Sequence, residues 1–329
     1  MAEVLLKVEN LSTEFRTEGG VVKAVDDISF EVRTGETFAL VGESGCGKSV
    51  TALSIMRLIP SPPGEITAGR VMFDGQDLLR IPNKAMRAIR GSKIGMIFQE
   101  PMSSLNPVLT IQSQLSEPLK IHMDLSGKAA NARAEELINM VGIPDAKTRL
   151  NQYPHELSGG QRQRIMIAMA MSCTPRLLIA DEATTALDVT IQAQILDLMQ
   201  DVTEQTGAAL LIITHNLGIV ARYADKVAVM YAGKLREVSG AAELYAEPQH
   251  PYTVGLLRSV PRLDADKGAP LTPIAGEIPD LTDLPGGCAF NPRCKWAVDR
   301  CRVEDPVLEE VSPGRQVACF EHASVARHV

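Results

Sequence analysis

The eight residues from Gly42 to Ser49 read GESGCGKS and match the pattern G-x-x-x-x-G-K-S/T at each fixed position. Thr37 to Val41 form a short apolar run typical of a buried strand, and apolar side chains recur at helical spacing from Ser49 to Leu58. A glycine-rich loop between a strand and a helix aims backbone N–H groups and the positive helix end at a phosphate. Lys48 can reach the β- and γ-phosphates, and the Ser49 hydroxyl can ligate Mg²⁺. The segment therefore predicts a nucleoside triphosphate site.

Two carboxylates follow a second apolar strand far downstream. Arg176 to Glu182 read RLLIADE, and in a parallel sheet the carboxyl ends of the strands face the ligand. Asp181 suits the coordination shell of Mg²⁺, and Glu182 suits a general base or a residue that orients water. A third apolar run, residues 208–214, ends at His215, which could hydrogen-bond the γ-phosphate or the attacking water. These strand ends predict hydrolysis of the bound nucleotide.

A second glycine motif precedes these carboxylates. Leu157 to Gln161 read LSGGQ, and Ser158 with its glycines opens a predicted helix that continues to Met171. The chain's own phosphate loop already holds a nucleotide. A second anion-binding helix start is therefore useful only if it closes on a nucleotide held by another subunit.

These motifs, in this order, resemble those of the nucleotide-binding subunits of ABC transporters over nearly the whole length of the chain. The resemblance implies an α/β fold, the P-loop NTPase of ABC type, with a mixed sheet core, an antiparallel β subdomain and a helical subdomain. By the same resemblance, Gln99 is the Q-loop glutamine, Asp188 the D-loop aspartate and His215 the switch histidine. Phe15 lies where the family offers an aromatic ring to adenine, although a plain hydrophobic contact is an open alternative.

The resemblance implies a head-to-tail dimer with a homologous ABC ATPase, in which ATP is held between the subunits. Its catalytic residues would be Glu182, His215 and Gln99, and its Mg²⁺ ligands Ser49, Gln99 and Asp181. The expected nucleotide contacts are Phe15, Gly42, Glu43, Ser44, Gly45, Cys46, Gly47, Lys48, Ser49, Val50, Gln99 and Asp181, and in trans Ser158, Gly159, Gly160, Gln161 and Asp188. Ala183 and Val50 depart from the common family residues, but neither change removes a catalytic group.

Composition bounds the remaining possibilities. The net charge of -7 argues against a broad nucleic-acid footprint, which usually needs a basic face. No apolar run approaches the ~20 residues of a membrane helix, and the chain opens with no signal peptide. The composition therefore indicates a soluble, cytosolic protein unless a partner holds it, so that any membrane role must be peripheral. The resemblance implies that it lies at the cytoplasmic face of a bacterial inner membrane.

The organisation along the chain predicts two domains. An ABC nucleotide-binding domain is expected over residues 1–240, with a helical subdomain at about 99–172 and an extension over 241–329. Within the first domain we expect a strand and turn at 71–75, an amphipathic helix at 126–141 and a hairpin at 227–238 that turns at Ala232 and Gly233.

The extension is rich in turns and contains four of the six cysteines, namely Cys288, Cys294, Cys301 and Cys319. Clustered cysteines in a cytosolic protein suggest a metal before a disulfide. The segments His-Pro-Tyr at 250–252 and Cys-x-Phe-x-Pro-Arg-Cys at 288–294 resemble the tail of oligopeptide and dipeptide importer ATPases, some of which carry an iron–sulfur cluster. The resemblance implies a small metal-binding extension with a structural 4Fe–4S cluster, with Zn²⁺ or unmetallated thiols as alternatives.

The expected function is ATP hydrolysis that powers the import of dipeptides or oligopeptides through a membrane ABC permease. The implied partners are a second, related ATPase in a heterodimer, two permease subunits and an extracytoplasmic peptide-binding protein, with no nucleic acid. An importer of nickel or another small solute is the nearest alternative. A soluble ABC ATPase acting on nucleic acid or iron–sulfur assembly, and an iron–sulfur redox protein regulated by ATP, are more distant ones.

Overall fold

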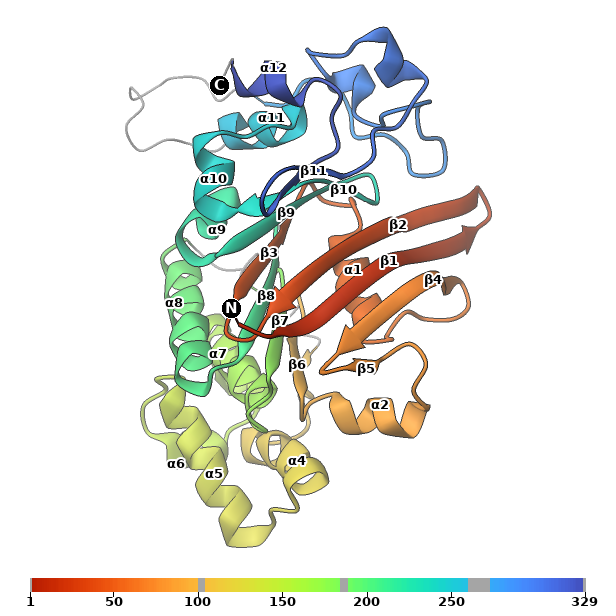
Figure 1. Cartoon of the computed structure of the whole chain (residues 1–329). Coiled ribbons are helices and arrows are strands. Elements are labelled where there is room, and N and C mark those ends of the chain that lie inside the picture. The colour runs from red at the N-terminus through yellow and green to blue at the C-terminus, as the bar shows by residue number, and fades with distance from the viewer. Residues whose placement is uncertain (1, 100–103, 184–188, 260–272, 328–329) are drawn as a thin grey trace. The chain divides into compact units, whose positions relative to one another are not determined.

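The computed structural model describes residues 2–99, 104–183, 189–259 and 273–327 (Figure 1). The chain divides into two compact units. The first consists of Met1–Leu5, Val32–Glu36 and Arg80–Ile212, and the second of Leu6–Glu31, Thr37–Leu79 and Ile213–Val329. Within the described ranges, no helix combines the length and the apolar character needed to cross a bilayer.

The strands of the first unit lie in the order β8-β7-β6, with bounds Ala209–Thr214, Leu177–Asp181 and Ile94–Ile97. β6 and β7 are parallel, with Ile94 opposite Leu177. All residues of β7 and β8 are buried, as expected for continuous apolar runs covered on both faces. The strands predicted before Glu182 and His215 are confirmed.

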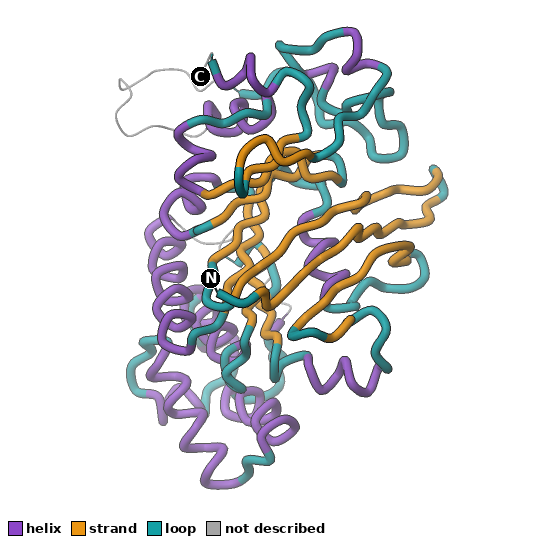
Figure 2. The backbone as a smooth tube through the Cα atoms, in the orientation of Figure 1, coloured by secondary structure: helices purple, strands orange, loops and turns teal. Residues whose placement is uncertain are grey.

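Helices make up most of the rest of the first unit (purple in Figure 2). In α5, Ala130, Ala134, Leu137 and Ile138 are buried on one face, which confirms the predicted amphipathic helix. This face packs against α4 and α7. The helical elements of this unit are α2 (Asn83–Ile89), α4 (Ile111–Met123), α5 (Gly127–Met140), α6 (Ala146–Leu150), η1 (Pro154–Glu156), α7 (Gly159–Ala170) and α8 (Val189–Thr206).

The second unit contains a four-stranded sheet in the order β2-β1-β4-β5. Its strands are β2 (Gly20–Arg33), β1 (Val4–Thr17), β4 (Gly64–Phe73) and β5 (Gln76–Asp77), and β4 runs antiparallel to both β1 and β5. The strand and turn predicted at 71–75 are confirmed. Asp74 and Gly75 both have positive φ angles, 51° and 76°, as a two-residue hairpin turn requires.

Further strands of the second unit lie in the order β11-β12-β10-β9-β3 within their sheet. β3 (Thr37–Val41) is parallel to β9 (Lys226–Tyr231), and β9 turns at Ala232 and Gly233 into antiparallel β10 (Lys234–Gly240), which confirms the predicted hairpin. β12 (Arg315–Val317) and β11 (Glu309–Ser312) come from the C-terminal extension, and β12 pairs antiparallel with β10. The extension therefore continues this sheet.

Short helices surround these strands. α1 (Lys48–Ile55) stops three residues short of the predicted end, because Arg57 takes a left-handed conformation with φ 51°. The other helical elements are α9 (Leu217–Tyr223), α10 (Ala241–Ala246), α11 (Pro251–Ser259), η2 (Asn291–Arg293), η3 (Asp299–Arg302) and α12 (His322–Ala326). Tyr252, Cys288 and Phe290 of the extension share one hydrophobic core with Val41 and Tyr231 of the sheet.

Candidate functional site

The phosphate loop connects β3 to α1 and depends on glycine at two crowded points. At Gly47, which has a φ of 109°, an added Cβ would lie 2.1 Å from the Ala24 carbonyl oxygen. At Gly42 it would lie 2.2 Å from the carbonyl oxygen of Met230 on β9. A side chain at either position would push the loop out of its conformation. The fold thus explains these two glycines as points of close backbone approach.

Lys48 lies at the first position of α1 and its side chain turns back into the loop. Its Nζ donates to the carbonyl oxygens of Gly42 at 2.8 Å and Glu43 at 2.9 Å. The residue is only 4% exposed, so its ammonium is held beside the loop rather than in bulk water. A phosphate group entering the loop would meet a cation that is already oriented.

The other predicted loop residues differ in their access to solvent. Ser44 and Gly45 at the loop's tip are exposed, and Ser49 and Val50 in the first turn of α1 are half-buried. Cys46 is buried, and burial raises the pKa of its thiol, although Lys48 opposes part of that rise. Cys46 is therefore a packing residue in this structure, and the loop's tip is the part open to a ligand.

In the first unit, the end of β7 brings two predicted catalytic residues together. The Gln99 Nε2 donates to the Glu182 Oε2 at 2.8 Å. Asp181, the last residue of β7, is buried, and Glu182 follows in a left-handed conformation with φ 43°. A positive φ in a residue other than glycine is uncommon and is often found at functional sites. Gln99 and Glu182, which the sequence predicts to be the Q-loop glutamine and the catalytic glutamate, thus form one hydrogen-bonded pair.

The LSGGQ segment forms the N-terminus of α7 through a reciprocal capping box. The Gln161 N–H donates to the Ser158 Oγ at 3.3 Å, and the Ser158 N–H donates to the Gln161 Oε1 at 3.0 Å. Ser158 and Gly159 are exposed, and an added Cβ at Gly160 would lie 3.4 Å from the Ile191 side chain. The predicted helix start is confirmed, and it faces solvent with its serine and glutamine side chains in defined positions.

The sequence did not reveal Gln163, one turn into α7. Its side chain is buried, and its Nε2 donates to the carbonyl oxygen of Ala183, directly after Glu182. This hydrogen bond links the LSGGQ helix to the backbone beside Glu182, the predicted catalytic residue. A glutamine on a buried helix face was the available signal, because buried amides are usually hydrogen-bonded.

The remaining predicted site residues are His215, Phe15 and Asp188. His215 is exposed after β8, where the Asn216 side chain caps α9 by accepting from the Gly218 N–H at 3.0 Å. Phe15 is half-buried on β1 with its ring against Gly64 of the neighbouring strand β4. Asp188 lies outside the described residues.

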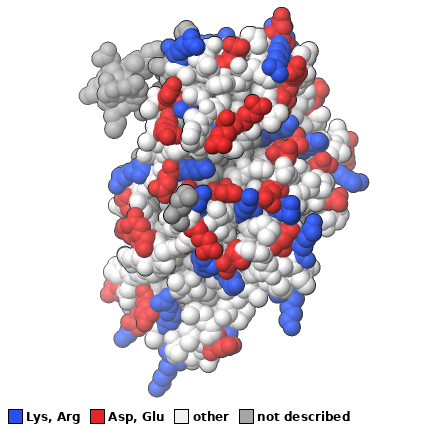
Figure 3. All heavy atoms as spheres, viewed as in Figure 1, with Lys and Arg blue, Asp and Glu red and all other residues white. Residues whose placement is uncertain are grey.

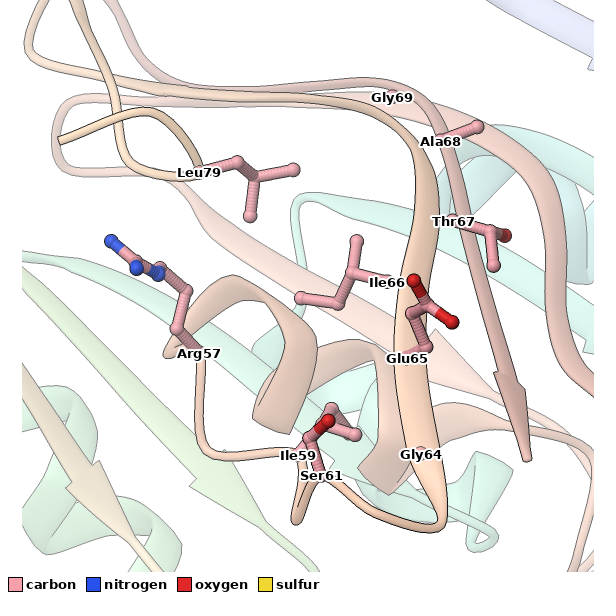
Figure 4. Close-up of a pocket in the computed structure, with 10 residues that line it drawn as sticks. All are labelled: Arg57, Ile59, Ser61, Gly64, Glu65, Ile66, Thr67, Ala68, Gly69 and Leu79. Atoms are coloured by element: carbon pink, nitrogen blue, oxygen red, sulfur yellow. The ribbon is translucent and has the colours of Figure 1, made fainter. Parts of the chain in front are cut away.

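A cavity of about 410 Å³ lies over β4 (Figure 4). Arg57, Glu65 and Leu79 are among the residues that line it, and Figure 4 shows them around the central side chain of Ile66. No residue of the phosphate loop belongs to its lining, so this cavity is not the predicted nucleotide site.

The four cysteines of the extension lie near one another. Cys288 and Cys301 are buried, and the Cys288 N–H donates to the Cys301 carbonyl at 2.9 Å. Burial raises the pKa of Cys294 to about 11 and that of Cys319 to about 12, with smaller upward contributions from the neighbouring thiols. Within the part of the chain that the structure describes, however, no three histidine, cysteine or acidic side chains form a group able to hold a metal ion. The predicted metal-binding extension is therefore not supported by this arrangement, in which burial favours the neutral thiols.

Two residues of the extension contact the phosphate loop, namely Tyr252 of the His-Pro-Tyr segment and Arg293 of the Pro-Arg-Cys segment. The Glu43 N–H donates to the Tyr252 hydroxyl oxygen at 2.8 Å, and the Arg293 guanidinium donates to both carboxylate oxygens of Glu43 at 2.7 and 3.0 Å. No local pattern indicates this pairing, because the partners are 209 and 250 positions apart along the chain.

Comparisons with protein families agree with the motifs. The model described as ABC transporter matches residues 25–185, and the model described as oligopeptide/dipeptide transporter, C-terminal region, matches residues 237–301. The dipeptide transport ATP-binding protein DppD of Bacillus subtilis is 52% identical over 97% of this chain and 93% of its own length. DppD of Escherichia coli is 49% identical, over 96% of each chain. A putative peptide import ATP-binding protein of Brucella abortus is 52% identical, over 98% of each.

Solved structures confirm the fold class. The dimeric ABC transporter cassette MJ0796 has a TM-score of 0.64 and 27% identity, over 72% of this chain and 98% of its own. The cbiO1 protein of Clostridium perfringens, part of the transporter complex cbiONQ, has a TM-score of 0.64 and 27% identity, over 74% and 92%. From its sequence relatives and its fold, the chain belongs to the ABC transporter ATP-binding proteins, in the branch that carries the oligopeptide/dipeptide transporter C-terminal region.

Proposed function

We propose that this chain binds and hydrolyses ATP to power the import of dipeptides or oligopeptides through a membrane ABC permease. The observation that carries the proposal is the joint presence of the ABC transporter match and the oligopeptide/dipeptide C-terminal match in one chain. The relatives named for peptide or dipeptide transport match this chain along nearly their full length. This favours peptides over nickel or another small solute as the transported substrate.

ATP would bind with its phosphates in the phosphate loop, where the exposed Ser44 and Gly45 and the inward-turned Lys48 support this role. Oxygen donors from Ser49, Gln99 and Asp181 suit Mg²⁺, which would neutralise charge on the β- and γ-phosphates. Phe15 would contact the adenine.

Glu182 would accept a proton from the attacking water or orient it, and His215 would hydrogen-bond the γ-phosphate. The hydrogen bond from Gln99 supports this role for Glu182, because it fixes the direction of the carboxylate before a substrate arrives.

A partner ATPase would complete the nucleotide-binding site. The exposed helix start at Ser158 and Gly159 offers backbone N–H groups and a positive dipole end to an anion from outside the chain. Gly160, Gln161 and Asp188 would act with them. A related but different ATPase subunit is the partner we propose, in a heterodimer.

Two permease subunits and an extracytoplasmic peptide-binding protein would complete the transporter, with this chain peripheral at the cytoplasmic face of the inner membrane. Exposed apolar side chains in the first unit support docking on a permease, since such groups gather at binding surfaces. They include Phe98, Val108, Leu109, Ile121 and Met123. On the face in Figure 3, lysine and arginine are interspersed with acidic side chains rather than gathered as for nucleic acid.

We retain the division into residues 1–240 and 241–329, and a 4Fe–4S cluster or Zn²⁺ on the four cysteines, as proposals. The clustering of the four cysteines within one extension of the sequence motivates the metal proposal. Metal analysis and visible absorbance of anaerobically purified protein test it. Absence of both iron and zinc would leave the cysteines as packing residues.

The variant Glu182→Gln tests the central proposal. It keeps the shape of the side chain and removes the base, so MgATP binding should persist while turnover falls by about 10²-fold or more. An ATPase assay alongside a nucleotide-binding titration measures both. Hydrolysis at the unmodified rate in Glu182→Gln would refute the catalytic assignment.

A further inference from the structure

The C-terminal extension holds one residue of the phosphate loop from two sides. Glu43 receives a bidentate ion pair from Arg293, whose side chain is 4% exposed, and its N–H is taken by the Tyr252 hydroxyl. The carbonyl of the same Glu43 accepts from Lys48. Glu43 is therefore the link between two residues of the extension and the phosphate-binding lysine.

Aromatic packing fixes the two residues that hold Glu43. The rings of Tyr231 and Tyr252 lie 4.6 Å apart, and Phe290 lies 5.2 Å from Tyr231 and 5.4 Å from Tyr252. The Arg293 guanidinium lies 5.8 Å from the centres of both Tyr231 and Phe290. Contacts of this kind favour a planar cation in one orientation. Arg293 therefore reaches the loop from a rigid site.

The charge of Glu43 gives this arrangement a role in binding. A carboxylate within the phosphate loop repels the triphosphate that the loop should hold, and the repulsion is strong where water is partly excluded. A bidentate guanidinium neutralises the carboxylate and directs it toward the extension. With the Glu43 N–H held by Tyr252, the loop keeps one backbone conformation when no nucleotide is bound.

We propose that Arg293, supported by Tyr252, is a positioning residue that sets the affinity of the phosphate loop for MgATP through Glu43. The proposal rests on the nucleotide site proposed above. It makes the extension a part of that site. Arg293 lies in the segment between Cys288 and Cys294, so a movement of this segment would change the ion pair with Glu43.

A double-mutant cycle between Arg293 and Glu43 tests the proposal on the full chain. Arg293→Met should weaken the binding of Mg–AMP-PNP about tenfold and raise the KM for ATP similarly, while kcat changes less than about twofold. Arg293→Lys, which keeps the charge, should recover part of the loss. When Glu43 is already glutamine, Arg293→Met should change the affinity less than about threefold, because no carboxylate is then left unpaired.

Two outcomes would overturn the proposal: unchanged affinity in Arg293→Met, or the same loss in the Glu43→Gln background. Arg300→Met is the matched control, since Arg300 forms an exposed ion pair with Glu304 in the same extension and should leave binding unchanged. If Arg293→Met does not fold, Arg293→Lys and the double variant still decide the question. A wild-type chain that fails to bind nucleotide would refute the proposed function, whereas a binding wild type with an unaffected Arg293→Met refutes only this inference.

Discussion

Arg315 on β12 neutralises a carboxylate that has no access to water. Its Nη2 donates to the Glu237 Oε1 at 3.1 Å, and Glu237 is 0% exposed. Glu237 also accepts from the N–H groups of Gln249 and His250, both at 2.9 Å. Replacement of Arg315 by methionine would leave the negative charge buried with these two neutral donors.

The expected cost is about 3–5 kcal/mol, the usual range when one partner of a buried ion pair is removed. The two N–H groups that remain place the value toward the lower end. In the double variant Arg315→Met with Glu237→Gln, more than half of the loss should be recovered, because the uncompensated charge is gone.

Trp296 provides the assay, since it is the single tryptophan of the chain and lies in the same extension. Urea unfolding followed by its fluorescence reports the free energy of unfolding of the second unit. Arg16→Met is the control for stability, because the side chains of the Arg16–Glu65 pair in the same unit are 80% and 60% exposed and the pair should contribute less than about 1 kcal/mol. A loss below about 1 kcal/mol in Arg315→Met, or no recovery in the double variant, would refute the reasoning.

Three further outcomes are expected. Gly47→Ala should lower the free energy of unfolding by at least about 1 kcal/mol more than Gly45→Ala does, as measured by urea titration. The reason is that an added Cβ would lie 2.1 Å from a carbonyl oxygen at Gly47, whereas it would meet nothing within 4 Å at Gly45. Burial lowers the pKa of His250 to about 3. Below about pH 6.5 the unfolded chain therefore binds a proton that the folded chain does not bind. The free energy of unfolding should fall by about 2 kcal/mol from pH 7.5 to pH 5. Unfolding curves at the two pH values should show a smaller fall in the His250→Asn variant. An equal fall would show that another group causes the pH dependence. Gln163→Leu should lower kcat several-fold with little change in KM in a steady-state ATPase assay, because the variant loses the hydrogen bond to the Ala183 carbonyl. An unchanged kcat would show that this hydrogen bond is purely structural.

The local parts of the site could be predicted from the sequence because they depend on neighbouring residues. The phosphate loop, its strand and the helix start at Ser158 follow from glycine spacing and from the apolar runs beside it. The end of α1 was missed, because the left-handed conformation of Arg57 depends on its surroundings, including a hydrogen bond from its Nη1 to the Leu78 carbonyl.

The long-range parts could not be predicted from one sequence. No local pattern pairs Glu43 with Arg293, because their meeting depends on the packing of Phe290 and Tyr231 in the folded core. The clustering of cysteines and the family resemblance suggested a metal, but cysteines also fill hydrophobic cores, as Cys288 and Cys301 do here.

The pairing of β12 with β10 also protects the molecule from self-association. Without it, β10 would present a row of unpaired N–H and C=O groups, which can pair with another chain. With β11 and β12 in place, the outermost strand is short and carries exposed Glu309 and Glu310, whose like charges repel a second copy. A chain cut after residue 240 should therefore aggregate through β10, so the extension is also a solubility element of the fold.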